Sequence, residues 1–151
     1  MQTVGMAKRV VRRMAAVTAT ALYFGVARHL PSSSDPLGRG LTNPFRARLV
    51  RFMFNGKCGR HITVERGAWF GFFSIWGVNM QIGEGSGIGI NARLEVADGL
   101  VIGENVMIGP DVVIYTGNHR HDDVTRPMVL QGGHGAPVVI EDDVWIEGRG
   151  S

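Results

Sequence analysis

Residues 102–116 read IGENVMIGPDVVIYT, and the isoleucines of this stretch stand six positions apart. The same interval separates the aliphatic residues in IGEGSGIGINARL at 82–94 and in IEDDVWI at 140–146. An α-helix repeats every 3.6 residues and a β-strand every two, so neither produces a period of six. The interval instead predicts a coil of short straight sides joined by turns, in which each side sends one aliphatic side chain inward.

Stacked coils of this kind would bury a continuous aliphatic column and satisfy the backbone through parallel ladders. A glycine often follows the aliphatic residue, as in Ile82-Gly83 and Ile108-Gly109, where it would relieve crowding or supply positive φ at a corner. The alternative is an antiparallel β-sandwich, whose strands would alternate with a period of two. Because that fold gives no recurrence at six, the sequence predicts a mainly β protein built as a parallel β-helix.

An N-terminal segment, residues 1–55, lacks the repeat and is predicted to be helical, with a polar connector rich in Pro, Ser and Gly at 31–40. Its uncharged run MAAVTATALYFGVA at 14–27 is shorter than the roughly 20 residues that a membrane-spanning helix needs. VARHLPSSSDP stands in place of the small-x-small cleavage site of a secretory signal. Apolar residues recur at helical spacing, so we expect an amphipathic helix packed on the domain. Contact between its basic face and a membrane surface is the alternative.

The repeat itself is predicted over residues 56–151, after a second short helix near 43–54. A loop at 117–135 interrupts the hexads and is expected to project from the coil. The net charge is +3, but the basic residues gather near the start of the chain, so a general nucleic-acid surface is not indicated. The single Cys58 excludes an internal disulfide and fits a reducing compartment. We therefore expect a cytoplasmic protein, peripheral to the membrane if the first helix contacts lipid.

Several motifs of the chain resemble one family. IGENVMIGPDVVIYTGNH at 102–119 and APVVIEDDVWI at 136–146 resemble the hexapeptide-repeat acyltransferases, in particular the maltose and galactoside O-acetyltransferase-like group. YFGVARHLPSSSDPLG, ERGAWFG and GEGSGIGIN resemble polysaccharide-modifying members of that group. The resemblance implies a left-handed parallel β-helix and a homotrimer with active sites between neighbouring subunits. It also implies that the loop 117–135 reaches an adjacent subunit.

The implied reaction is transfer of an acetyl or similar acyl group from coenzyme A to a saccharide hydroxyl. Such a transfer needs a base for the hydroxyl proton and a donor for the oxyanion. By match to the family's TGNH motif, His119 is the base, and Asn118 beside it contacts the acceptor. Asn91 and Asp98 are acceptor contacts by a looser alignment, and Trp145 lies near the acyl or pantetheine end of the donor.

No permanently bound cofactor or metal is expected, because acetyl-CoA or another acyl-CoA enters as a co-substrate that is already activated. For the same reason Cys58 is not expected to act as a nucleophile. The alternative for His119 is a loop histidine that moves no proton, and the alternative for Trp145 is packing on the coil. A zinc site is the remaining alternative; it would draw on His119, His121 and His134 with Asp122 or Asp123.

The last residues, 145–151, read WIEGRGS, whereas the resemblance implies further hexads that complete the coenzyme A groove. We therefore expect this chain to be a C-terminally truncated member that is less stable than a longer relative and weak or inactive. The alternative function is a non-catalytic scaffold or an inactive fragment of such an enzyme.

Overall fold

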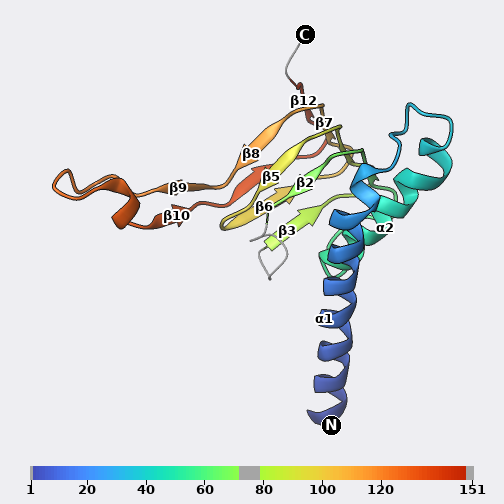
Figure 1. Cartoon of the computed structure of the whole chain (residues 1–151), viewed down its shortest axis with the longest axis horizontal. Coiled ribbons are helices and arrows are strands. Elements are labelled where there is room, and N and C mark those ends of the chain that lie inside the picture. Colours follow the sequence, from blue (N-terminus) through green and yellow to red (C-terminus); the bar gives the residue numbers. More distant parts are fainter. Residues whose placement is uncertain (1, 72–78, 149–151) are drawn as a thin grey trace.

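The computed structural model describes residues 2–71 and 79–148, and in these residues two α-helices with short helical turns precede many short strands (Figure 1). The helices are α1 (Gln2–Gly25), η1 (Ala27–His29), η2 (Gly38–Thr42), α2 (Asn43–Met53) and η3 (Met128–Leu130). The strands are β1 (Thr63–Val64), β2 (Trp69–Phe70), β3 (Asn79–Ile82), β4 (Gly87–Ile88), β5 (Arg93–Glu95), β6 (Gly99–Ile102), β7 (Met107–Ile108), β8 (Val113–Tyr115), β9 (Gly117–His119), β10 (Gly133–Gly135), β11 (Val138–Ile140) and β12 (Trp145–Ile146). The helix predicted near 43–54 is α2.

Ten of the strands form three parallel sheets, with the orders β1-β4-β7-β12, β3-β6-β11 and β2-β5-β8. Consecutive strands of the coil enter the three sheets in rotation, so each pass through all three sheets places one coil on the previous one. This connectivity is compatible with a β-helix. The two remaining strands, β9 and β10, pair antiparallel with each other.

The aliphatic residues of the hexads stack on one another across the ladders. Ile82 is paired with Ile102, which is paired with Ile140 on its other side, and Leu94 is paired with Ile114. These positions line the interior, where Ile82, Leu94 and Ile102 are at most 2% exposed. The interval of six therefore corresponds to inward-facing columns, as the sequence predicts.

The sequence predicts that glycine both relieves crowding between coils and supplies positive φ at corners, but in the structure asparagine and aspartate occupy most of the positive-φ corners. A Cβ on Gly83 would collide with the backbone oxygen of Gly103 in the next coil, so this glycine relieves crowding. The corners with positive φ are instead occupied mostly by short polar side chains, whose local hydrogen bonding lets them adopt the left-handed region. In the coil these are Asn91, Asn105, Asp111 and Asp143, with φ between 54° and 58°.

The helical segment is joined to the first coil (residues 57–71) by buried polar contacts. Arg46 on α2 is fully buried, and its Nε donates to Val64 O at 2.6 Å while its Nη1 donates to Pro31 O at 3.0 Å. Tyr23 on α1 is also fully buried and donates its hydroxyl to Ala68 O at 2.8 Å. These bonds tie both helices to the first coil through donors that are themselves buried.

The first helix packs through a different face from the one that its apolar residues suggested. Ala16, Ala19 and Tyr23 are buried, whereas most of the larger apolar side chains are exposed. Those exposed side chains are Met6, Val10, Val11, Met14, Val17 and Leu22. Figure 1 shows the N-terminal half of α1 projecting away from the strands. The expected helix is present, but only its C-terminal half has a packed face.

By length and composition, one stretch of the described chain, Arg9–His29, is suited to crossing a membrane. This stretch is longer than the uncharged run at 14–27, so the prediction that the segment is too short to span a membrane rested on too narrow a segment. The same length and composition also occur in core helices and in signal sequences.

Candidate functional site

The strands β9 and β10 form an arm (residues 117–135) that extends sideways from the coil (Figure 1). Their register places His119 opposite Gly133 and Asn118 opposite His134. At the base of the arm, a Cβ on Gly135 would lie 2.7 Å from the Cβ of Asp98, so the backbone of the arm rests directly on that residue. The structure thus brings Asp98 to the root of the strand pair that carries Asn118 and His119.

His119 is exposed on the arm, as a base that must meet an external substrate requires. Its backbone N–H donates to Oδ1 of Asn118 at 2.8 Å. No hydrogen bond to its imidazole occurs within the described residues. A ring nitrogen of His121 lies 3.4 Å from the backbone oxygen of His119. Both ring nitrogens of His119 are therefore open to a partner from outside the chain.

The tip of the arm is held in shape by its own hydrogen bonds. Asp123 accepts from the hydroxyl of Thr125 at 2.6 Å and from its N–H at 3.0 Å, and these bonds hold the pKa of the carboxyl below its usual value. Gln131 donates to Asp123 O at 2.8 Å and to Arg126 O at 2.9 Å. Apolar side chains of the tip nevertheless face solvent, with Val124 96% exposed.

Two of the predicted site residues lie away from the arm. Asn91 is at the corner between β4 and β5, where its N–H donates to Arg66 O at 3.0 Å and its side chain stands over Gly67. Trp145 is on β12, and its side chain is 66% exposed. The catalytic and binding roles of all five residues stay predictions.

Neither a metal centre nor a cysteine nucleophile is formed by the described part of the chain. Across residues 2–71 and 79–148, no group of three or more His, Cys, Asp or Glu side chains is arranged to hold a metal ion. Cys58 is buried, and burial raises the pKa of its thiol to about 12. At neutral pH the thiol is protonated and shielded, which makes it a poor nucleophile.

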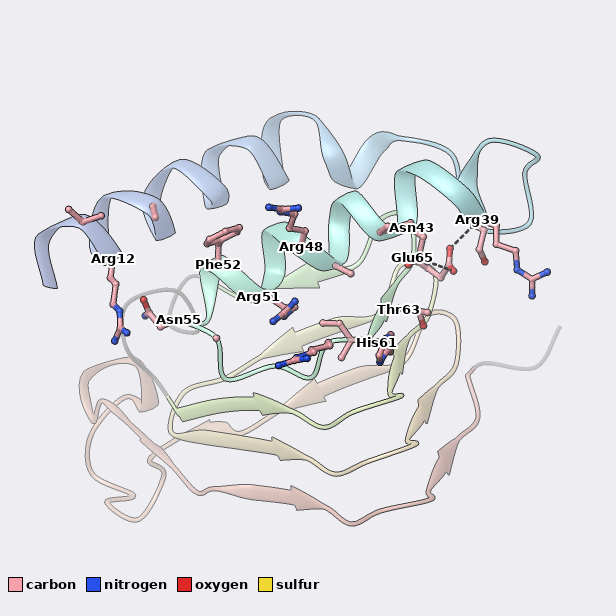
Figure 2. Close-up of a pocket in the computed structure, with 18 residues that line it drawn as sticks. Arg12, Arg39, Asn43, Arg48, Arg51, Phe52, Asn55, His61, Thr63 and Glu65 are labelled. Atoms are coloured by element: carbon pink, nitrogen blue, oxygen red, sulfur yellow. Dashed lines mark hydrogen bonds between the residues drawn. The ribbon is translucent and has the colours of Figure 1, made fainter. Parts of the chain in front are cut away.

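A groove that the sequence argument did not anticipate lies between α1, α2 and the first coil (Figure 2). It encloses about 1070 Å³. We call it the basic groove, because five arginines line it, Arg12, Arg39, Arg48, Arg51 and Arg60, together with His61 and Glu65. None of the predicted site residues contributes to it. The sequence signal was the excess of arginine before residue 61, but convergence of these side chains depends on how α1 and α2 pack.

Comparison with known proteins gives partial matches to acetyltransferases. The chain is 40% identical over 105 residues to Putative acetyltransferase YJL218W of Saccharomyces cerevisiae, and the aligned region covers 68% of this chain and 49% of that protein. It is 38% identical over 77 residues to Nodulation protein L of Rhizobium leguminosarum bv. viciae, covering 51% of this chain and 40% of that protein. A third relative, Putative acetyltransferase DDB_G0275913 of Dictyostelium discoideum, is 32% identical over 73 residues, covering 48% of this chain and 37% of that protein.

The chain thus spans about half or less of the length of the curated relatives it matches. No family model matches it, and no solved structure matches it. The similarities support an acetyltransferase family, without singling out a group within it.

Proposed function

We propose that the protein is a coenzyme-A-dependent O-acyltransferase of the hexapeptide-repeat, maltose and galactoside O-acetyltransferase-like group. Its acceptor would be a hydroxyl of a saccharide or polysaccharide precursor, and its donor acetyl-CoA or another acyl-CoA. The strands would wind as a left-handed parallel β-helix. The supporting observations are the three parallel sheets and the similarity to proteins named acetyltransferases.

The observation that carries this proposal is the exposed His119 on the arm, beside Asn118 and above Asp98. As the acceptor oxygen attacks the thioester carbonyl, His119 takes the hydroxyl proton. The C–O bond forms and the thioester C–S bond breaks, which gives the ester and the thiolate of coenzyme A. The thiolate then receives the proton from the His119 imidazolium. Asn118 and Asp98 would orient the acceptor, Asn91 would contact it from another subunit's corner, and Trp145 would contact the donor.

The proposed assembly is a homotrimer in which the arm reaches a neighbouring subunit. The arm tip supports this, because its shape is fixed by internal hydrogen bonds while Val124 and Val129 remain 96% and 78% exposed. Exposed apolar side chains on an ordered element are typical of an interface. We also place the protein in the cytoplasm, with peripheral membrane contact through α1.

Calorimetry with coenzyme A on the 151-residue chain, with the molar mass from light scattering in the same buffer, tests the donor and the assembly together. The proposal predicts micromolar or tighter binding and the mass of a trimer. Absence of binding would contradict catalysis by this chain and favour the alternative, a non-catalytic scaffold or inactive fragment.

A further inference from the structure

The basic groove is lined by positive charge from four parts of the chain, including Arg39 of η2. Arg12 comes from α1, Arg48 and Arg51 from α2, and Arg60 from the first coil, and Figure 2 shows the first three around the groove. A groove lined by charges of one sign raises the local concentration of anions. Guanidinium forks match the oxygen geometry of phosphate.

The carboxylates near the basic groove are already committed to other partners. Glu65 accepts from Asn43 Nδ2 at 2.8 Å and from Ser33 N–H at 2.9 Å, and it lies 3.8 Å from Nη2 of the buried Arg46. Glu84 is paired with His61. Within the described residues, none of the five groove arginines forms an ion pair with a carboxylate.

One guanidinium of the groove also has an unsatisfied donor. Nε of Arg51 is buried and has no hydrogen-bond partner within the described residues. A buried donor without a partner is costly, but this atom is closed to solvent, so it offers a groove ligand no direct contact.

The walls of the groove are apolar as well as basic. Val11 of α1, Ala47 and Phe52 of α2, and Ile62 of the first coil all line it. Phe52 is 48% exposed and Val11 is 65% exposed. A small inorganic anion would leave these side chains in water, whereas an amphiphile with a phosphate headgroup would contact both parts of the lining.

The helix that forms one wall of the groove also carries an exposed apolar stripe. Met6, Val10, Met14 and Val17 follow the spacing of one helix face and are 66%, 51%, 65% and 57% exposed. Arg9 and Arg13, both exposed, flank this stripe. Amphipathic helices with an apolar face and flanking basic residues lie in the plane of a membrane interface.

We propose that the basic groove binds the phosphate headgroup of an acidic phospholipid while the apolar stripe of α1 rests in the membrane interface. This inference rests on the peripheral membrane contact proposed above and is independent of acyl transfer. Basic pockets beside membrane-associated helices recognise anionic headgroups by the same charge complementarity.

Co-sedimentation with phosphatidylcholine vesicles, with and without phosphatidylglycerol, tests the proposal on the full chain. We expect tight binding only when phosphatidylglycerol is present. The double variant Arg48→Gln/Arg51→Gln should bind these vesicles about tenfold more weakly or worse, since each basic residue at an anionic surface contributes appreciably. Circular dichroism establishes that the variant is folded.

The matched control is Arg120→Gln/Arg126→Gln, which removes the same charge from the exposed β9–β10 arm, outside both the groove and the apolar stripe. We expect a loss of only about twofold to threefold from this pair, because diffuse charges at a surface are screened by salt. An equal loss from both pairs would mean a diffuse electrostatic attraction and would overturn the headgroup site.

Two calorimetric titrations separate other occupants of the groove. Inorganic pyrophosphate that binds to the wild-type chain as tightly as the phosphatidylglycerol vesicles do would identify a soluble anion and overturn the lipid proposal. A loss of coenzyme A affinity in Arg48→Gln/Arg51→Gln that matches its loss of vesicle binding would assign the groove to the donor, with the same consequence. Loss of lipid binding with coenzyme A binding retained supports the inference.

Discussion

The coil and the β9–β10 arm differ in how far their apolar side chains are exposed to solvent. In the coil, Leu94 and Ile102 are at most 1% exposed, whereas in the arm Val124 is 96% exposed and Val129 is 78% exposed. The coil obtains its stability from burial, and the arm obtains its shape from hydrogen bonds at its tip. We infer that the coil is a scaffold, whereas the arm presents exposed side chains such as His119 and Val124 to a substrate or a partner subunit.

The largest effect is expected from truncating a side chain in the coil interior. Ile102→Ala removes buried atoms between Ile82 and Ile140 and should lower the free energy of unfolding by about 2–5 kcal/mol. The corresponding change in the arm, Val124→Ala, should cost less than about 0.5 kcal/mol. Urea unfolding at low protein concentration measures both, and equal losses would contradict the difference in burial.

A smaller loss is expected from adding one methyl group between two coils. Gly83→Ala places a Cβ against the backbone of Gly103, so the coils must move apart, at a cost of about 1–3 kcal/mol. Gly25→Ala is the control, because a Cβ there meets nothing within 4 Å. A neutral result at Gly83 in thermal unfolding would show that the ladders are looser than the structure indicates.

At neutral pH the smallest effect concerns Cys58, at the boundary between α2 and the coil. Because the pKa of the folded thiol is raised to about 12, the folded chain keeps a proton that the unfolded chain loses near pH 8.5. The stability due to the neutral thiol is therefore complete below pH 8.5 and declines from there toward pH 12. Iodoacetamide should label Cys58 only after unfolding in urea, and rapid labelling of the native chain would contradict its burial.

The coil was predictable because its environment repeats. Ile82, Ile102 and Ile140 occupy the same place in successive coils, so one physical requirement appears in the sequence several times. The face on which α1 packs was not predictable, since small residues such as Ala16 and Ala19 form the contact while larger apolar residues remain exposed. Helical spacing alone contains no information about which face finds a partner.

The candidate site was predictable only where a motif carried it. His119 and Asn118 follow from TGNH, but the position of Asp98 beneath the arm depends on where β10 returns to the coil. The basic groove gave only a compositional signal, the excess of arginine before residue 61, because its arginines are up to 48 residues apart, from Arg12 to Arg60. Tertiary packing of four separate elements lines one groove with them.

The central claim is that His119 is the base for acyl transfer, and release of free thiol from acetyl-CoA in the presence of a saccharide acceptor measures it directly. We expect weak but acceptor-dependent release by the wild-type chain and a rate about 100- to 10,000-fold lower in His119→Ala. The matched control His121→Ala changes another exposed histidine of the same arm and should retain nearly the full rate. An unchanged rate in His119→Ala, or equal losses in the two variants, would contradict the claim.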